Sequence, residues 1–417
     1  MSKQSSRKPT IGGLLLILAA IAIAILFPNL SGKNTATPIA PIPPTVQVVT
    51  KVPNVTVTPQ QPGVPPTVGP TVTAGQSQPQ TGGLPGWLKI EFTNPVPPDN
   101  VANGIDKTVV DAINQAQKTI DVTSFDLNLP SFVNALVAAS KRGVQVRVVY
   151  DGTNGSQKLE AARAGGTEFD AIPVMKSAGI GLVDGGRSSG LMHDKIIIID
   201  SKVLFMGSWN MSYNDTFRNN NNRLEITAPK LIANYQAKFN ELFVDKHFGT
   251  HATVGAQTPQ MTIDGIQVEN YFSPPDKVMD KIIAYVNAAQ KSIRFIAFTY
   301  TDKDLAAAMV SRFNAGVDVA GVIENRGASQ GALVPLVCGK VPAKVDGNPY
   351  TMHHKVIVID GSIVITGSFN FTLSADNEND DNIIVIHDPV VAKLYLDEYD
   401  RVNSIAKAPN PADIKCK

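Results

Sequence analysis

Two stretches of the sequence share a spacing of residue types that suits chemistry on a phosphate group. The first is LMHDKIIIIDSKVLFMGSWN at 191–210, and the second is TMHHKVIVIDGSIVITGSFN at 351–370. Each contains His-x-Lys, four apolar residues, Asp and, seven residues after that Asp, Gly-Ser-x-Asn. An imidazole can attack phosphorus or transfer a proton, while ammonium, hydroxyl and amide groups stabilise a phosphoryl oxyanion.

On a β-strand, residues i and i+2 face the same side, so each histidine should emerge beside its lysine. A turn after each Asp, followed by a second apolar strand, would form a hairpin that returns Gly-Ser-x-Asn to the same place. The expected catalytic residues are His193, Lys195, His353 and Lys355. The expected phosphate ligands are Ser208, Asn210, Ser368 and Asn370, with Asp200 and Asp360 in supporting structural roles.

The elements that must position these motifs are also duplicated. Residues 116–125 read AQKTIDVTSF and residues 289–298 read AQKSIRFIAF, an offset of 173. Amphipathic helices are predicted at 109–116, 132–141, 278–289 and 305–314, and strands alternate with them. This order predicts an α/β fold with two similar lobes, each a central mixed, mainly parallel sheet flanked by helices. A pseudo-twofold should relate the lobes and bring the half-sites together.

The chain divides by composition into seven segments. Residues 1–10 are a basic end, 11–27 an uncharged apolar run of seventeen residues, and 28–86 a spacer rich in Pro and Thr. Lobe 1 is expected at 87–248, a connector at 249–264, lobe 2 at 265–405 and a tail at 406–417. The apolar run is interpreted as a transmembrane signal anchor, with a cleaved signal peptide as the alternative, and the rest of the chain would lie outside the cytoplasm.

Charge and cysteine content exclude some classes of protein. Residues 1–86 contain five basic and no acidic side chains, so the remainder, with 32 basic and 36 acidic groups, has a formal net charge of −4. Such a body lacks the broad positive field of a nonspecific nucleic-acid binder. Two cysteines exclude a Cys-rich zinc module. Outside the cytoplasm, Cys338 and Cys416 are expected to form a disulfide that holds the tail, although two free thiols are the alternative.

With its paired His-x-Lys-(four)-Asp segments followed by Gly-Ser-x-Asn, the sequence resembles the phospholipase D superfamily over about residues 88–405. The resemblance implies a phosphohistidine intermediate without a cofactor or metal, and it points to His193 as the nucleophile. It also implies an acidic partner about 28 residues after each histidine. Asp381 stands at that distance from His353, whereas lobe 1 has Asn221, Asn222 and Arg223 there, with Glu225 only a weak substitute.

Three functions follow from these observations. The leading one is hydrolysis of phospholipid headgroup diesters by a membrane-anchored monomer. A nuclease is the second, and it would need a basic groove built from Arg187, Arg218, Arg223, Arg326, Lys340 and Lys344. The third is a catalytically silent phosphate-binding scaffold, which the missing acid of lobe 1 would favour. Asn210 and Asn370 begin Asn-x-Ser/Thr sequons inside the expected site, which favours a bacterial source.

Overall fold

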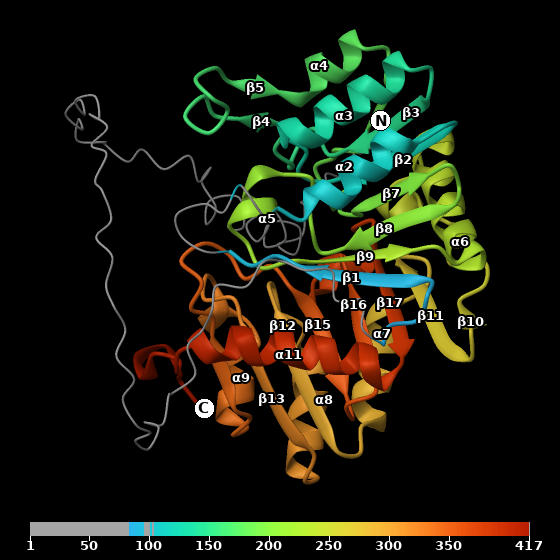
Figure 1. Cartoon of the computed structure of the whole chain (residues 1–417). Coiled ribbons are helices and arrows are strands. Elements are labelled where there is room, and N and C mark those ends of the chain that lie inside the picture. Colours follow the sequence, from blue (N-terminus) through green and yellow to red (C-terminus); the bar gives the residue numbers. More distant parts are fainter. Residues whose placement is uncertain (1–82, 96–100, 102–103, 417) are drawn as a thin grey trace, which may run out of the picture. The chain divides into compact units, whose positions relative to one another are not determined.

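The structure is a computed structural model that describes residues 83–95, 101 and 104–416. The basic end, the expected anchor at 11–27 and nearly all of the expected spacer lie outside the described residues. Within the described part of the chain, no helix is long and apolar enough to cross a membrane. The described residues form the duplicated body, which Figure 1 shows in colour.

A seven-stranded sheet forms the centre of lobe 1. Its strands follow the order β1-β9-β8-β7-β2-β3-β6. Their bounds are β1 Leu88–Phe92, β2 Thr119–Ser124, β3 Gln145–Tyr150, β6 Gly181–Asp184, β7 Ile196–Ile199, β8 Val203–Gly207 and β9 Asn222–Ile226. A separate two-stranded ribbon joins β4 (Lys158–Leu159) to β5 (Phe169–Asp170).

Lobe 2 repeats this sheet and adds one edge strand. The order is β10-β11-β17-β16-β15-β12-β13-β14. The bounds are β10 Gln260–Ile263, β11 Ile266–Ser273, β12 Ser292–Ala297, β13 Asp318–Ile323, β14 Ala343–Val345, β15 Lys355–Ile359, β16 Ile363–Gly367 and β17 Asp381–His387. Strand β10 lies inside the stretch expected to be a connector, because its four residues are too few to show a hydrophobic period.

The two sheets are mixed, as expected, but mainly parallel pairing was wrong. In lobe 1 only β2–β3 and β3–β6 are parallel, and in lobe 2 only β12–β13 and β13–β14 are. The helix-connected repeat produces these parallel pairs. The antiparallel pairs include the motif hairpins β7–β8 and β15–β16, whose short turns favour antiparallel neighbours. They also include pairs between strands that are distant in the sequence, such as β2–β7 and β11–β17.

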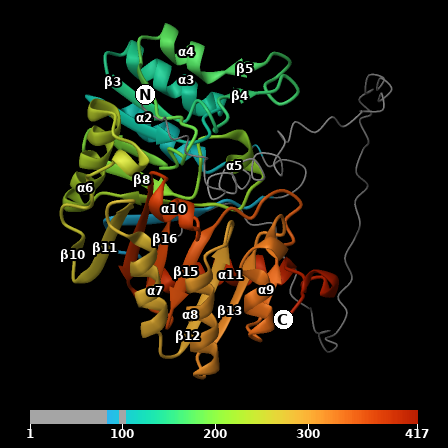
Figure 2. The same ribbon diagram turned by 180° about the vertical axis from the view of Figure 1, so that it is seen from behind.

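Helices cover both faces of each sheet. In lobe 1 they are α2 (Asp106–Gln115), α3 (Pro130–Lys141), α4 (Ala171–Ser177), α5 (Tyr213–Phe217) and α6 (Pro229–Asn240). In lobe 2 they are α7 (Val278–Ala288), α8 (Lys303–Asn314), α9 (Leu333–Cys338), α10 (Leu373–Asn377) and α11 (Pro389–Ile405). The longer repeat helices lie within a few residues of their predicted bounds. Figure 1 shows α11 in front of β12 and β13, and Figure 2 shows α7 and α8 on the opposite face.

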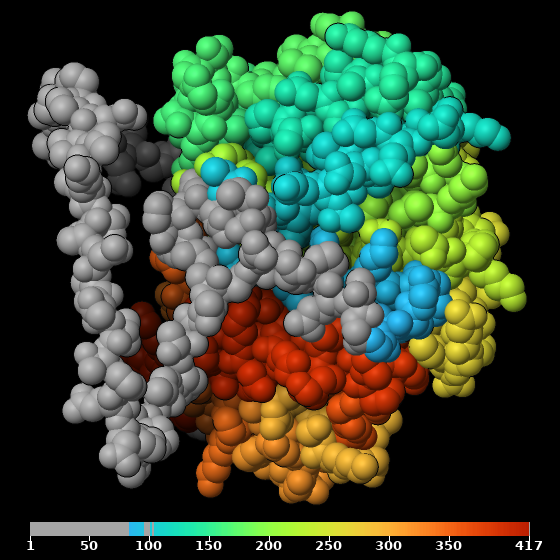
Figure 3. Space-filling view, in the orientation of Figure 1, coloured from blue at the N-terminus to red at the C-terminus, as the bar shows by residue number. Residues whose placement is uncertain are grey.

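Three large apolar cores correspond to these layers. One core packs α2, α3 and α4 against the sheet of lobe 1, and another packs α7, α8 and α9 against the sheet of lobe 2. The third combines residues of both lobes, among them Ile196 and Leu204 from lobe 1 with Val356, Val364 and Tyr395 from lobe 2. The two lobes therefore share a continuous hydrophobic interior. Figure 3 shows the outer surface of the same body, with lobe 1 in blue to yellow-green and lobe 2 in yellow to red.

Backbone contacts between the lobes obey the pseudo-twofold. Met192 bridges Asp380, and Asn220 bridges Met352; an offset of 160 converts one pair into the other with the lobes exchanged. The backbone N–H of His193 donates to the Asp380 carbonyl at 3.0 Å, and that of His353 donates to the Asn220 carbonyl at 2.9 Å. This self-complementary arrangement is that of a twofold interface. It fixes each His-x-Lys motif against the opposite lobe.

The C-terminal tail is attached to lobe 2 at two points. Cys338, at the end of α9, forms the expected disulfide with Cys416. Nearer the end of α11, Lys407 and Val345 exchange backbone hydrogen bonds in an isolated bridge. The tail is therefore held along the side of the lobe 2 sheet.

Candidate active site

The two motif histidines lie at the interface between the lobes and are almost fully buried, with 4% and 6% exposure for His193 and His353. His193 and Lys195 precede β7, and His353 precedes β15, which Lys355 begins. The expected hairpins are present, because β7 pairs with β8 and β15 with β16 in antiparallel register. Each histidine thus stands at the entrance of a buried strand whose position is fixed by the sheet.

His193 receives its acidic partner from the opposite lobe. Its Nδ1 lies 2.7 Å from Oδ1 of Asp381, the first residue of β17. Burial alone would raise the pKa of Asp381, but His193 and Lys195 hold it below its ordinary value. Since an ionised carboxylate only accepts hydrogen bonds, Nδ1 of His193 carries the proton and Nε2 carries the lone pair. Burial lowers the pKa of His193, and Asp381 partly opposes this.

His353 has an amide where His193 has a carboxylate. Its Nδ1 lies 2.9 Å from Oδ1 of Asn221 in lobe 1, and Nδ2 of Asn221 donates to the Asp215 carbonyl at 3.2 Å. The amide oxygen therefore accepts from the protonated Nδ1, which again leaves the lone pair on Nε2. Burial, followed by repulsion from Lys355 and Lys195, lowers the pKa of His353 well below its ordinary value.

These contacts correct the expected assignment of the acid within a single lobe. Asp381 follows His353 by 28 residues in the sequence, but it partners His193. Asn221, which stands where an acid was expected, contacts His353. His193 keeps a carboxylate partner, Asp381. Sequence spacing alone could not reveal this, because the pseudo-twofold exchanges the partners between lobes.

Each lysine is tied to the histidine two residues before it. Nζ of Lys195 donates to the His193 carbonyl at 2.6 Å, and Nζ of Lys355 donates to the His353 carbonyl at 2.8 Å. Burial lowers the pKa of Lys195, although Asp381 and Asp215 oppose this. Burial and repulsion from Lys195 lower the pKa of Lys355 well below its ordinary value. The two ammonium groups are thus close enough to repel each other, as they would be around one shared anion.

The motif serines hold the partners of the histidines, which differs from the expected direct contact with phosphate. Oγ of Ser208 donates to Oδ1 of Asn221 at 2.9 Å, and Oγ of Ser368 donates to Oδ1 of Asp381 at 2.6 Å. The Asn222 backbone N–H in turn donates to Ser208 at 3.1 Å. Both hydroxyls are thus used within the protein, in equivalent positions of the two lobes.

The motif asparagines differ between lobes. Nδ2 of Asn210 donates to Oδ2 of Asp215 at 2.7 Å. Asn370 has Ala375 at the position equivalent to Asp215, and its Oδ1 is buried without a hydrogen-bond partner in the described structure. Among the described residues, the amide oxygen of Asn370 therefore lacks the hydrogen bond that the amide oxygen of Asn210 makes with the backbone N–H of Asp126.

The motif aspartates occupy the hairpin turns. Asp200 has φ 51° and accepts backbone N–H groups of Gln117, Lys118 and Thr119. Asp360, with φ 53°, makes the equivalent contacts with residues 290–292. These contacts agree with the structural role expected for both residues.

Two phenylalanines of the site were not identified from the sequence. Phe125 contacts the His193 ring edge-on at 5.3 Å, and Phe298 contacts the His353 ring at 4.7 Å. The nearby ammonium groups of Lys195 and Lys355 lie 5.6 and 4.8 Å from the centres of these two rings. Both phenylalanines end the AQK repeat at equivalent positions, so the duplication itself carried the signal.

Two acidic side chains accept backbone hydrogen bonds from the residues that precede the motif histidines. Asp151 accepts the Met192 backbone N–H at 3.1 Å, and Glu324 accepts the Met352 N–H at 2.7 Å. These acids are separated by the same offset of 173 as the AQK repeats. Each fixes the residue immediately before a motif histidine.

The lobe 1 half-site has two carboxylates that lobe 2 lacks. Asp126 and Asp215 correspond to Thr299 and Ala375 under the two offsets. Burial, followed by the charge of Asp215, raises the pKa of Asp126 to about 6. The backbone N–H of Asp126 donates to Oδ1 of Asn210 at 3.3 Å. The site is therefore pseudo-symmetric in shape but asymmetric in charge.

The basic residues proposed for a nucleic-acid groove are mostly committed to other contacts. Arg187 pairs with Asp380 at 3.0 Å, Arg326 pairs with Glu324 at 2.8 Å, and Arg223 is buried against Glu91. Arg218 stacks over Tyr213 and Tyr350. Lys340 is exposed and Lys344 half-buried in lobe 2. The guanidinium groups thus serve to join elements of the protein.

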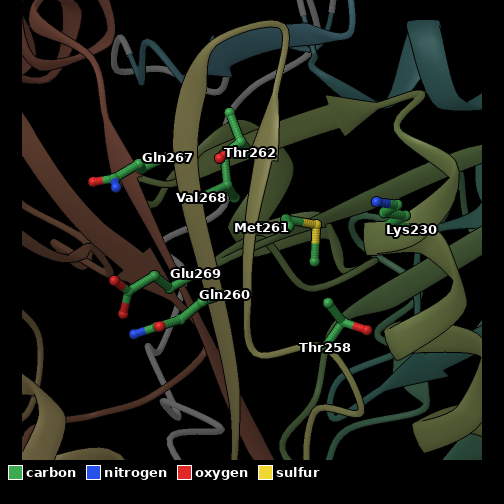
Figure 4. Close-up of a pocket in the computed structure, with 8 residues that line it drawn as sticks. All are labelled: Lys230, Thr258, Gln260, Met261, Thr262, Gln267, Val268 and Glu269. Atoms are coloured by element: carbon green, nitrogen blue, oxygen red, sulfur yellow. The ribbon is translucent and has the colours of Figure 1, made fainter.

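A cavity of about 470 Å³ lies away from the motifs, beside the β10–β11 hairpin and α6 (Figure 4). Its lining residues are Lys230, Thr258, Gln260, Met261, Thr262, Gln267, Val268 and Glu269. None of them belongs to a His-x-Lys or Gly-Ser-x-Asn motif. Among the described residues, no group of three or more His, Cys, Asp or Glu side chains is arranged to hold a metal ion.

Comparison with known proteins agrees with this architecture. The family model described as "Cardiolipin synthase, PLD-like domain" matches residues 109–243 and 282–403, one match in each lobe. The chain belongs to the PLD-like family. The resemblance inferred from the paired motifs is thereby confirmed.

Several PLD-like relatives are similar to part of the chain. A mitochondrial cardiolipin hydrolase of Xenopus tropicalis is 33% identical over 129 residues, which cover 30% of this chain and 61% of the relative. A phospholipase D of Rickettsia prowazekii is 34% identical over 134 residues, or 32% of this chain and 65% of the relative. The chain thus spans less than two thirds of the length of these curated relatives.

A solved structure supports the two-lobed PLD-like fold. Phosphatidylserine synthase of Haemophilus influenzae superposes with a TM-score of 0.57 over 77% of this chain and 87% of that chain. The sequence identity is 12%, so the likeness concerns the fold alone. The α/β fold with two similar lobes is therefore confirmed.

Proposed function

We propose that the protein is a phosphodiesterase that hydrolyses phospholipid headgroup diesters through a phosphohistidine on His193. The observation that carries this proposal is the cross-lobe pair of His193 with Asp381 at 2.7 Å, opposite His353 on the other lobe. A buried imidazole that is neutral and oriented by a carboxylate is a suitable nucleophile. His353, paired with an amide, then serves as the group that transfers protons.

In the first step, the Nε2 lone pair of His193 forms a bond to phosphorus. The bond from phosphorus to the leaving alkoxide breaks, and the alkoxide takes a proton from Nε2 of His353. Because burial keeps the pKa of His353 low, it gains this proton when the diester anion binds beside it. The ammonium groups of Lys195 and Lys355 stabilise the negative charge that grows on the nonbridging oxygens.

In the second step, water attacks the phosphohistidine. His353 takes the proton of the water, the new P–O bond forms, and the P–N bond to His193 breaks. Both histidines then have the protonation states of the enzyme–substrate complex, and His353 releases its proton to solvent when the product leaves. A primary alcohol could replace water, which would give a transferred phosphatidyl product.

A lipid substrate is favoured over nucleic acid by three observations. The body has a formal net charge of −4, and the arginines that would line a basic groove are engaged in internal contacts. Two of the similar relatives are named phospholipase D and cardiolipin hydrolase. A silent scaffold loses its main support, since the acid missing from lobe 1 leaves the nucleophile paired.

The proposed location is the outer face of a membrane. The apolar run at 11–27, retained as an anchor, would hold the body there, or its removal would release a secreted form. A disulfide between Cys338 and Cys416 suits such an oxidising compartment.

The decisive experiment is a substrate panel in the presence of a chelator. Vesicles of zwitterionic and of anionic phospholipids, single-stranded DNA and double-stranded DNA would be incubated with wild type and with the His193→Ala and His353→Ala variants. We expect phosphatidic acid from lipid, a phosphatidyl alcohol when a primary alcohol is added, and loss of both products in each variant.

Acid-labile phosphate on the enzyme identifies the nucleophile. Brief incubation with a diester that has a nitrophenolate leaving group should label His193 in wild type and in the His353→Ala variant, since that leaving group needs no proton. Label on His353 would reverse the assignment. Cleavage of DNA but not of lipid would establish the nuclease instead, and folded protein inactive on all substrates would support the scaffold.

A further inference from the structure

The acid that lobe 1 lacks at Asn221 has a counterpart on a neighbouring helix. We propose that Asp215, on α5, is the positioning residue that supplies the negative charge for His353. This inference rests on the proposed role of His353 as the proton-transferring group. Oδ2 of Asp215 lies 3.5 Å from Nδ1 of His353, and Asp215 is only 3% exposed.

The carboxylate of Asp215 is held in place by donors from the same half-site. Its Oδ2 accepts the backbone N–H of Asn210 at 2.9 Å and Nδ2 of Asn210 at 2.7 Å. Its Oδ1 accepts Nδ2 of Asn219 at 2.5 Å. Three N–H groups thus solvate the carboxylate inside the protein and aim it at the edge of the His353 ring.

The carboxylate beside the histidine lies on a strand in one half-site and on a helix in the other. Asn219 and Asn379 are equivalent under the offset of 160. Nδ2 of Asn379 donates to Asp381, the strand acid that pairs with His193, at 3.2 Å. Nδ2 of Asn219 instead donates to Asp215. In each half-site, therefore, one carboxylate lies beside both the equivalent asparagine and Nδ1 of a motif histidine.

A purely structural role for Asp215 is less consistent with the contacts. Helix α5 is capped by Ser212, whose side chain accepts the Asp215 backbone N–H, and α10 is capped in the same way by Thr372. The equivalent of Asp215 on α10 is Ala375, so this short helix forms without an acid at that position. The Asp215 side chain is not required for the cap.

The charges around His353 explain why it needs an acid. Lys355, Lys195, His193 and His354 all lower its pKa, after burial itself. Asn221 orients the ring but adds no charge. Asp215 and, beyond it, Asp126 provide negative charge on the α5 side. Without Asp215, the imidazolium form of His353 would lose the carboxylate 3.5 Å from its Nδ1 while Lys355 and Lys195 remain, so it would lose its proton more readily.

The first test measures the protonation of His353 directly and does not require activity. NMR titration of the histidine rings, with His353 assigned through His353→Ala, would compare wild type, Asp215→Asn and Asp215→Asn with Asn221→Asp. We expect Asp215→Asn to lower the pKa of His353 and Asn221→Asp to restore it. An unchanged pKa in Asp215→Asn, with a response to Asn221→Asp, would overturn the proposal.

The second test uses the leaving group. For a diester with an alkyl leaving group, Asp215→Asn should lower kcat at least about tenfold, because protonation of a poor leaving group depends on His353. For a nitrophenyl diester the loss should be no more than about threefold, since nitrophenolate leaves without a proton. Addition of Asn221→Asp should recover the activity on the alkyl diester.

Thr216→Val provides the matched control on the same helix. Oγ1 of Thr216 bonds to Trp209 and to the Ser212 carbonyl, so this change disturbs α5 without removing a charge. Its effect on kcat should be equal for both leaving groups. Equal losses in Asp215→Asn would indicate a structural role and overturn the proposal. Wild type inactive on every diester would refute the proposed function, while the titration would still report on Asp215.

Discussion

The two motif lysines are buried ammonium groups held close to each other. Nζ of each donates to the carbonyl of its own histidine, and burial together with mutual repulsion lowers the pKa of Lys355 well below its ordinary value. An anion bound between them would relieve this repulsion. The free site is therefore suited to binding an anion, and its positive charge is sensitive to alkaline pH.

This sensitivity gives a prediction for the pH dependence of the reaction. As pH rises through the lowered pKa of Lys355, the ammonium loses its proton, so kcat/KM should fall at a pH below the ordinary lysine value of 10.5. In the enzyme–substrate complex the phosphate anion stabilises the ammonium, so the fall in kcat should occur at higher pH. Steady-state kinetics between pH 5 and 11 would measure the pH at which kcat/KM falls and the pH at which kcat falls.

Lys355→Arg is the control for this assignment. A guanidinium stays protonated over the whole range, so the variant, although slower, should lose the alkaline fall in kcat/KM or show it at higher pH. A fall that keeps its position in Lys355→Arg would show that another group titrates there.

At the scale of elements, the motif hairpin places its last glycine against the neighbouring strand. Gly207 ends β8 with φ 142°, a conformation that side chains rarely adopt. A Cβ there would overlap the backbone carbonyl oxygen of Asn222 on β9. Glycine therefore lets β8 and β9 approach, which brings Ser208 and Asn221 within hydrogen-bonding distance.

Gly207→Ala should consequently separate the two strands. We expect the free energy of unfolding to fall by more than about 2 kcal/mol, because the clash is with backbone that cannot rotate away. Activity should also fall, since Asn221 would shift relative to His353. Urea unfolding and the phospholipid assay would measure the two effects.

Gly361→Ser is the matched substitution in the turn of the other hairpin. Gly361 also has a positive φ, 65°, but a Cβ there meets open space. Ser201 already occupies the equivalent position of lobe 1 with φ 52°. The cost should be about 1 kcal/mol, without loss of activity. If both variants were equally destabilised, backbone conformation and not close approach would explain Gly207.

Next to the motif strands, the two lobes have different ionisable residues at equivalent positions. Lobe 2 pairs His354 with Glu398 at 2.7 Å, and Glu398 pairs with Arg401 at 2.6 Å. In lobe 1 the equivalents are Asp194, Lys238 and Glu241, with Lys238 and Glu241 paired at 2.7 Å. Burial raises the pKa of Asp194 to about 7. In lobe 1, Oδ1 of Asp194 instead accepts Nδ2 of Asn382 at 2.6 Å, so the two lobes differ in the contacts made at this position.

At the scale of the whole molecule, the two lobes form one functional unit. Tyr235 of lobe 1 donates to Asn382 of lobe 2 at 3.2 Å, and Asn222 donates to Tyr395 at 2.9 Å. These polar contacts lie within the apolar core that both lobes share. Because each histidine takes its partner from the other lobe, an isolated lobe would lack both a covered core and a complete site.

The disulfide acts at this same scale. It closes a loop between residues 78 positions apart, so its removal in a Cys338→Ser, Cys416→Ser double variant should lower the free energy of unfolding by roughly 4 kcal/mol. Helix α9 belongs to the outer core of lobe 2, away from the lobe interface, so activity at 25 °C should be retained.

Urea unfolding with and without reductant measures this effect. Reductant should destabilise wild type but not the double variant. Equal sensitivity of both proteins to reductant would show that the bond does not contribute to stability, and loss of activity in the folded double variant would show that the tail reaches the site.

The sequence by itself determined the duplicated α/β fold, the motif hairpins and the four His-x-Lys residues. These features are local: hydrophobic period, turn residues and repeat offsets act over a few residues and read directly along the chain. The predicted helices of both AQK repeats lie close to their observed bounds for the same reason. The share of parallel pairing was misjudged, because strand direction depends on neighbours that are distant in the sequence.

Only the tertiary structure decided which groups act on which histidine. Asp381 stands 28 residues after His353 yet contacts His193, and Asp215 approaches His353 from a helix of the other lobe. A pseudo-twofold exchanges partners across the interface, so distance along the chain carries no information about these pairs. Hydrogen bonds and charges act over a few ångströms of space, and the packing of one lobe on the other sets those distances.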